Sequence, residues 1–342
     1  MHWAASQAKV AALGRPELGG APLSSGHYAE VHGHTLHAEI CRAVTAQESW
    51  GEELPHPELN VNHPSAGTAL HWAISQRLPQ ASLALATCPH FLVVNARLAV
   101  DGSTAIHLAA AEGMNDVLEA LLRRADIGTV ASVDRDGFTA LHGAAFRGHL
   151  ECVKSLMVCP RFITSIGAVG AFDVARPPGH WARDATMEYD MTTVLHMAAS
   201  QGHAEVCDAI LTIAPRETAM FNSANRMGAT ALHMAARQKH TKTCEAILRH
   251  ETFTAVNAHD ARGFTVLHWA AHQASGDICA ALLAREDFTA FEVRDLRGRT
   301  AMDIARDAGH FEVSRLILGR TGTAGLRELE RRPLAVSLGR DA

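Results

Sequence analysis

A four-residue phrase that starts with Thr and ends with His returns at nearly even intervals along the chain. It occurs at Thr68–His71, Thr104–His107, Thr139–His142, Thr193–His196, Thr230–His233 and Thr265–His268, and in altered form at Thr300–Asp303. The fourth positions are 36, 35, 54, 37, 35 and 35 residues apart, so one long step interrupts a period of about 35 residues. A fixed period of this length indicates repeated units stacked in a row, rather than the two or three domains that 342 residues would ordinarily suggest.

Each unit carries signals for a turn and two short helices. Thr139 is a good N-cap, because its hydroxyl can accept a hydrogen bond from an otherwise unpaired backbone N–H. Leu141, Ala144 and Ala145 then form one helical face, and Gly148 ends the helix. A turn at 134–137 precedes the Thr. A second helix is expected from about His149, with its apolar face made by Leu150, Val153, Leu156 and Met157.

Helices this short need neighbours, because isolated helices below about 12–15 residues are marginal in water. Paired alanines in the first helix of each unit allow close helix–helix approach. The pairs are Ala109–Ala110, Ala144–Ala145, Ala198–Ala199, Ala235–Ala236 and Ala270–Ala271. Stacked units would therefore supply the core that one unit lacks.

The repeated pattern resembles the ankyrin-repeat family over roughly residues 60 to 318. In one unit the matching residues are Gly137, Thr139, Leu141, His142, Ala144, Ala145, Gly148 and His149. The segment Gly202–Val206 matches the start of a second helix in another unit. The Pro usual after the Thr is Ala or Val here, which a helix start tolerates. The resemblance implies an all-α solenoid of stacked helix-turn-helix units with short β-hairpin-like turns.

Three regions are expected from the repeat boundaries. Residues 1–58 form a degenerate repeat with a Gly/Pro-rich insertion, residues 59–319 form an array of about seven units, and residues 320–342 form a flexible tail. The long step places an insertion at 163–189 that contains Trp181, and the family resemblance implies that it projects as a finger loop.

The N-terminal region is expected to contain two helix segments separated by a loop. A helix start at Met1–Gln7 and a helix at His37–Val44 flank a loop at Gly14–Gly26. Because this unit starts within the phrase, a longer product with upstream repeats is expected.

Composition excludes several classes of protein. Apolar residues make up 47%, which excludes wholesale disorder, and a net charge of -5 disfavours nucleic acid as the partner. The sequence has no stretch of about 20 continuous apolar residues, so no membrane span is expected. Seven cysteines without secretory features favour free thiols in a reducing compartment, so we expect an intracellular, cytoplasmic protein.

Ten of the 22 histidines follow the repeat, which argues against metal or acid–base chemistry for them. One set ends the phrases, and a second set lies seven residues on, at His149, His203, His240 and His310. A residue type that recurs at the same position of every unit is expected to have a structural role in the unit. The family resemblance implies that these histidines form hydrogen bonds within and between turns. Cys207, Cys244 and Cys279 share one phase on the buried side of the second helix, Cys152 lies one residue earlier, and Cys41 fits the same place by local match. We therefore expect no metal and no cofactor.

Sequence motifs for catalysis are absent. The chain has no P-loop, no G-x-S-x-G and no H-E-x-x-H, and no segment outside the repeats is long enough for a catalytic domain. The prediction is a protein without enzymatic activity and without a small-molecule substrate. A His/Cys metalloenzyme is the competing interpretation, which a metal analysis of the purified protein would test.

Residues that vary between units at turn tips and on the exposed side of first helices are the candidates for recognition. The candidates are Phe138, Phe146, Arg147, Gln201, Arg226, Met227, Arg237, Arg262, Phe264, His272, Gln273, Arg297 and Arg299. The resemblance implies that these positions line a concave groove. Arg pairs bidentately with carboxylate or phosphate, so the groove suits an acidic or phosphorylated segment, although exposed Arg is usually a solvated surface. Trp181 would either anchor a partner or pack on the convex helices.

The leading hypothesis is a non-catalytic scaffold or adaptor that binds another protein through the concave groove and the turn tips. The alternative is a targeting arm or fragment of a larger ankyrin-containing enzyme or channel.

Overall fold

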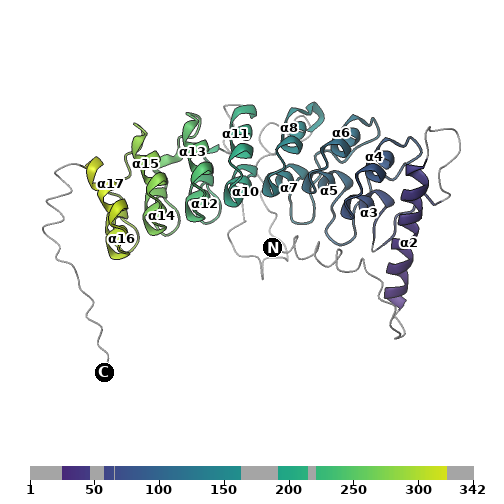
Figure 1. The fold of residues 1–342 in the computed structure, drawn as a ribbon, viewed down its shortest axis with the longest axis horizontal. Coiled ribbons are helices and arrows are strands. Elements are labelled where there is room, and N and C mark those ends of the chain that lie inside the picture. The colour runs from purple at the N-terminus through teal and green to yellow at the C-terminus, as the bar shows by residue number, and fades with distance from the viewer. Residues whose placement is uncertain (1–24, 47–57, 65, 163–191, 215–220, 322–342) are drawn as a thin grey trace, which may run out of the picture.

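Pairs of short helices follow one another and stack side by side into an elongated array, seen from end to end in the computed structural model (Figure 1). The structure describes residues 25–46, 58–64, 66–162, 192–214 and 221–321, with side chains within 34–320. The expected finger loop with Trp181, the expected helix start at residues 1–7 and all of the expected tail after Thr321 lie outside the described residues.

The first helix of each pair begins directly after the Thr of the phrase. These helices are α3 (Ala69–Ser75), α5 (Ala105–Ala111), α7 (Ala140–Arg147), α10 (Val194–Gln201), α12 (Ala231–Arg237), α14 (Val266–His272) and α16 (Ala301–Asp307). The second helices are α4 (Pro79–Thr87), α6 (Asn115–Arg123), α8 (Leu150–Val158), α11 (Ala204–Ile213), α13 (Thr241–Arg249), α15 (Gly276–Ala284) and α17 (Phe311–Thr321).

Local chemistry fixes the ends of the first helices as the sequence predicts. The seven phrase Thr residues are N-caps in extended backbone geometry, each in a reciprocal capping box with the fourth residue of the phrase. At the other end of α7, Gly148 adopts the left-handed conformation, with φ of 78°. This conformation ends the helix and turns the chain into α8.

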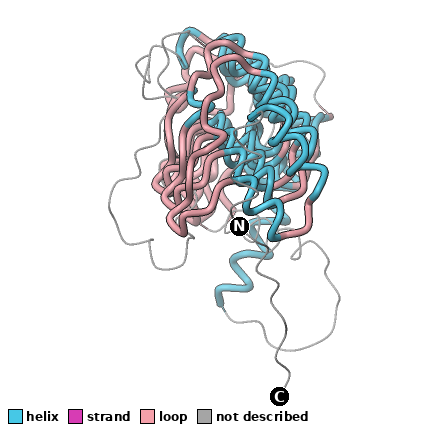
Figure 2. Tube along the Cα trace, turned by 90° about the vertical axis from the view of Figure 1, so that its left-hand side faces the viewer, coloured by secondary structure: helices cyan, strands magenta, loops and turns pink. Residues whose placement is uncertain are grey.

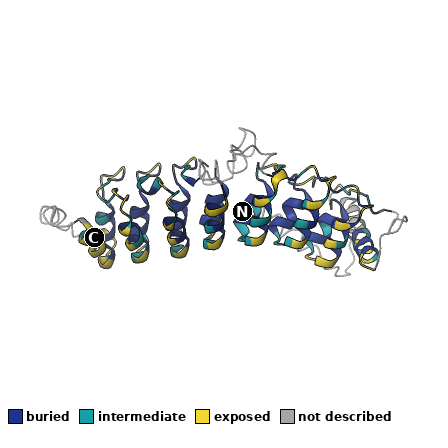
Figure 3. Ribbon diagram, turned by 90° about the horizontal axis from the view of Figure 1, so that it is seen from above, coloured by how far each residue is buried: buried dark blue, intermediate teal, exposed yellow. Residues whose placement is uncertain are grey.

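The alanine pairs lie where neighbouring units meet. All ten of these alanines are fully buried, and each first helix packs against the first helix of the next unit. Figure 3 shows buried residues between successive helices and exposed residues along the outer edges. The low aromatic content of 5% fits this arrangement, because close helix–helix stacking leaves little room for rings.

Hairpin-like turns connect the units and lie together on one side of the helices (Figure 2). Isolated antiparallel bridges close four of them, at His63–Gly67, Arg97–Thr104, Val133–Thr139 and His259–Thr265. The all-α solenoid with short β-hairpin-like turns is thus confirmed.

The N-terminal helix is longer than the expected segment at 37–44. Helix α2 runs from Ser25 to Thr45 and packs against α3 and α4. His37, Ile40, Cys41 and Val44 are buried on one face of it, at the spacing of an amphipathic helix. The chain from residue 27 to Thr45 holds no Pro and a single Gly, so nothing local stops the helix at residue 37.

A strained residue in the loop between α14 and α15 provides a stability test. Ala274 has φ of 57° at the repeat position that Gly148 occupies, and a Cβ disfavours this conformation. Ala274→Gly should raise the free energy of unfolding by about 1 kcal/mol, measured by urea denaturation. The matched control is Ala280→Gly on the exposed side of α15, which should lower it by about 0.5–1 kcal/mol. Destabilisation by both changes would contradict the strain at Ala274.

Candidate functional site

The phrase histidines are part of the framework rather than of a reactive site. The backbone N–H and the hydroxyl of the phrase Thr donate to His Nδ1, with Oγ1–Nδ1 distances of 2.7–2.9 Å. In four units the opposite nitrogen, Nε2, donates to a carbonyl of the next unit. These bonds join His107 to Phe138, His196 to Ala229, His233 to Phe264 and His268 to Arg299, at 2.9–3.3 Å. Each such ring is therefore held as one neutral tautomer.

Burial keeps these rings neutral. It lowers the pKa of His71, His107, His196 and His233 to about 4 and that of His142 to about 3. The second histidine set also joins units, because Nε2 of His149, His203 and His240 donates to Ala111, Phe146 and Ser200 carbonyls.

The cysteines are free and mostly buried. The five cysteines of the second-helix positions and of α2 are buried, and burial raises the pKa of Cys41, Cys152, Cys244 and Cys279 to about 12. These thiols are poor nucleophiles for that reason. Among the described residues, no group of three or more His, Cys, Asp or Glu side chains is placed to hold a metal ion.

An Asp or Asn side chain shapes the tip of each of the last three described hairpins. In each, Oδ1 accepts hydrogen bonds from the backbone N–H groups two and four residues on, at 2.8–3.0 Å. The three residues are Asn225, Asp260 and Asp295, and all are buried. Because each side chain caps its own turn, the residue two positions on is held at the tip.

Backbone hydrogen bonds join neighbouring tips into a row. Ala261 N donates to Met227 O at 2.8 Å, and Leu296 N donates to Arg262 O at 3.1 Å. We call the tip residues Arg226, Met227, Arg262, Leu296 and Arg297 the tip row. The three arginines are exposed, and Leu296 is 81% exposed.

Trp269 on α14 lies behind the tip row in a fixed position. Its Nε1 donates to Asp260 Oδ2 at 3.0 Å, and its ring centroid lies 5.1 Å from that of Phe264. The Arg262 guanidinium carbon lies 5.8 Å from the Trp269 centroid, and the His272 ring meets its edge at 6.2 Å. One carboxylate therefore holds both the hairpin tip and the indole, and the guanidinium lies within cation–π distance of the ring.

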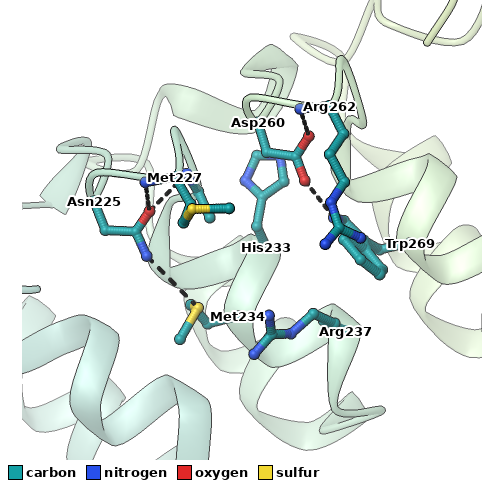
Figure 4. A pocket seen from close by; sticks show the side chains of 9 residues that line it. Asn225, Met227, His233, Met234, Arg237, Asp260, Arg262 and Trp269 are labelled. Atoms are coloured by element: carbon teal, nitrogen blue, oxygen red, sulfur yellow. Dashed lines mark hydrogen bonds between the residues drawn. The ribbon is translucent and has the colours of Figure 1, made fainter. Parts of the chain in front are cut away.

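A pocket opens between α12 and α14, beneath two adjacent tips (Figure 4). Its lining residues are Asn225, Met227, Ala229, His233, Met234, Arg237, Asp260, Arg262 and Trp269. Figure 4 shows the two methionines on one side and Arg262 in front of Trp269 on the other. The lining combines the apolar Met227, Ala229, Met234 and Trp269 with polar side chains and two arginines.

Comparisons with known proteins identify the family of this stack. A sequence model described as ankyrin repeats in three copies matches residues 85–164 and 179–257. These two stretches are therefore ankyrin repeats. Over 56 residues it is 39% identical to an ankyrin repeat-containing protein of Arabidopsis thaliana, a match that covers 16% of this chain and 10% of that protein. The chain thus spans about a tenth of the length of this curated relative.

Solved ankyrin structures share the fold. The ankyrin repeat domain of human ASB11 superposes with a TM-score of 0.54 at 20% identity, covering 74% of this chain and 97% of that one. The ankyrin repeat domain of Bcl-3, a member of the IkappaB protein family, gives 0.52 at 20% identity, covering 74% and 99%. At this identity the likeness concerns the fold alone.

The ankyrin stack brings together three of the candidate residues predicted from the sequence. Met227, Arg237 and Arg262 line one pocket, and Arg226 and Arg297 lie on the tip row beside it. Arg299 is partly engaged, since its guanidinium donates to the buried Asp295 carboxylate at 2.8 Å and its Nε at 3.0 Å. His272 and Gln273 follow at the end of α14, exposed and half-buried respectively.

Other candidates lie elsewhere or offer little surface. Phe264 is buried at 9% exposure against His268 and Trp269, so its ring packs rather than projects. Phe138, Phe146 and Arg147 are half-buried in the unit of α7, and the exposed Gln201 ends α10. The pocket is built from later units, so the structure does not gather these four residues at it.

Six of the nine lining residues were not among the candidates, and for two of these the repeat contains a signal. Met234 and Trp269 each follow the His of a phrase directly. That position changes from unit to unit, as Trp72, Leu108, Gly143, Met197, Met234 and Trp269 show. A variable position next to a constant one indicates recognition in a repeat protein, and it identifies both residues.

Proposed function

We propose that this protein is a non-catalytic adaptor that binds an acidic or phosphorylated segment of another protein along the tip row and the pocket behind it. Ankyrin repeats are generally protein–protein interaction modules, and the phrase histidines are used in joining units. The proposed partner surface comprises the hairpin tips and the exposed sides of α12 and α14.

The charge of the last three hairpin tips is the observation that carries the proposal. The tips at 225–229, 260–264 and 295–299 contain arginines and two aspartates, and both aspartates are buried and hydrogen-bonded to their own turns. The exposed charge of these tips is therefore positive, on a chain whose net charge is -5. Arg forms paired hydrogen bonds with carboxylate and phosphate, which favours an acidic partner.

Reversing the tip charge should abolish partner capture. The variant Arg226→Glu, Arg262→Glu and Arg297→Glu should keep its helicity and lose the captured partner, because three attractive contacts become repulsive. The measurement is affinity capture with mass spectrometry, next to circular dichroism.

The matched control for this triple variant changes Arg42, Arg123 and Arg320 to Glu. These exposed arginines lie on helices away from the tips, and the change in net charge is the same. Partners lost by the tip variant and kept by the control are the specific ones. Equal capture by the wild type and the tip variant would overturn the assignment of the surface.

The proposed setting is the cytoplasm. All seven cysteines are free in the structure, and free buried thiols persist in reducing compartments. None of the helices in the described part of the chain is long and apolar enough to cross a membrane.

A further inference from the structure

The pocket between α12 and α14 offers a group of apolar side chains to a ligand, among polar ones. Met227, Ala229 and Met234 line it, and Trp269 forms one wall (Figure 4). Met234 is 2% exposed and Trp269 9%, while Met227 is half-buried at the tip. Thioethers are unbranched and polarisable, so they adapt to ligand side chains of different shape.

The walls are held in place before any ligand arrives. Asp260 fixes the Trp269 indole and its own hairpin tip, and the bond from Ala261 N to Met227 O ties the two tips together. Asn225 fixes the other tip, and its Nδ2 lies 3.9 Å from the Met234 sulfur. A preorganised site loses little side-chain entropy on binding, so a small pocket can still contribute measurable affinity.

The positive charge at the rim is spread rather than focused. Arg262 lies at the pocket mouth, and Arg226 and Arg297 lie on the tips of the preceding and following units. One phosphate dianion is best bound by arginines that converge on it. Three arginines on three successive tips are better matched by several carboxylates along an extended segment.

We infer that the pocket receives one large apolar side chain of the partner and that Asp or Glu residues flank this side chain on both sides. The inference rests on the proposed function and deepens it by naming the recognition motif. The apolar residue supplies selectivity through burial against Met227 and Trp269, while its acidic neighbours pair with the tip row.

Immobilised peptides with defined centres test this motif. One array presents twelve-residue peptides of Glu and Ser with a central Leu, Ile, Met, Phe, Trp, Ala or Ser, and parallel arrays replace Glu by phosphoserine or by Gln. Purified full-length protein is bound to each, and fluorescence polarisation gives Kd for the best peptides. The wild type should prefer Glu peptides with a large apolar centre, by about tenfold over Ala, since burial of such a side chain contributes about 1.5–3 kcal/mol.

Single variants measure the contribution of the pocket to binding separately from that of the tip charge. Met227→Gln should remove most of the preference for an apolar centre and keep the preference for Glu over Gln, and Met227→Leu should restore it. Met302→Gln is the matched control, because Met302 is a half-buried methionine on α16 outside the pocket. Arg297→Gln, on the tip row but outside the pocket lining, should weaken all Glu peptides and leave the ranking of the centres unchanged.

Each contrary result has a distinct meaning. Binding to Glu peptides regardless of their centre, unchanged in Met227→Gln, overturns the pocket inference and leaves the proposed function standing. Stronger binding to phosphoserine peptides overturns the assignment to carboxylates. Equal binding to Glu and Gln peptides by the wild type and by the tip triple variant overturns both proposals.

Discussion

The array is expected to lose its helical structure cooperatively when the pH falls from 7 to about 4.5. Five phrase histidines are fully buried or nearly so, with pKa lowered to about 4 for His71, His107, His196 and His233 and to about 3 for His142. In the unfolded chain a histidine titrates near pH 6.5. The folded state therefore binds these protons less well than the unfolded state does.

The sign of the pH effect follows from this difference. Each buried neutral His stabilises the fold fully above pH 6.5, and its contribution declines as the pH falls from 6.5 toward 4. At pH 4.5 the loss is about 2–3 kcal/mol for each site, so five sites lose on the order of 10 kcal/mol. This sum is comparable with the whole stability of a typical domain.

One carboxyl group acts in the opposite direction. Burial raises the pKa of Asp134 to about 6, so protonation of this side chain stabilises the fold as the pH falls below 6. A single group of this kind offsets about one histidine. The net effect of acid remains a large loss of stability.

The measurement is circular dichroism at 222 nm against pH, repeated at two salt concentrations. Unfolding caused by buried histidines should have a midpoint between about pH 4 and 6 and change little with salt, whereas repulsion between surface charges would be screened. Full helicity retained at pH 4 would show that these rings are not buried and neutral in solution.

The framework was predictable because its signals are local and repeated. Thr139, His142 and Gly148 act within one unit, through a cap, a capping box and a helix stop, so a single copy already specifies the turn and helix ends. The alanine pairs indicated close stacking, and each is fully buried. Because seven copies repeat at one period, the architecture could be predicted without knowledge of contacts between distant residues.

Contacts between units were harder to predict, since they join residues more than 30 positions apart. Arg285 donates to the carbonyls of Leu248 and Phe253 in the preceding unit and pairs with Asp287. Asn257 bridges to the loop at Asp287 and Thr289. These side chains look like ordinary surface residues in the sequence, and only the stacking geometry gives them partners.

The binding surface was predicted in part for the same reason. Phase placed Arg262 on a tip, which the sequence alone can indicate. The pocket forms only where two units meet, and Phe264 packs against Trp269 of its own unit. Repeat phase therefore gives the side of the solenoid that a residue faces, and not whether a neighbour covers it.

Adding a single methyl group at Gly148 is expected to destabilise the array by about 2–3 kcal/mol. Gly148 has φ of 78°, where a Cβ costs about 1 kcal/mol relative to Gly. A Cβ built there would also lie 2.4 Å from Nδ1 of His203 in the next unit. His203 would have to move and lose its bond to the Phe146 carbonyl, now 3.1 Å long, which adds about 1–2 kcal/mol.

Gly309→Ala separates the two causes, because Gly309 has φ of 76° and nothing within 4 Å of the added Cβ. This control should cost about 1 kcal/mol, from backbone conformation alone. The excess loss in Gly148→Ala, measured by urea unfolding at pH 7, is then the contact between units. In the double variant Gly148→Ala with His203→Ala the clash disappears, so the two losses should sum to more than the double variant shows. Equal losses of unfolding free energy at Gly148 and Gly309 would mean that His203 does not contact Gly148. The units would then be joined less closely than the buried alanines require.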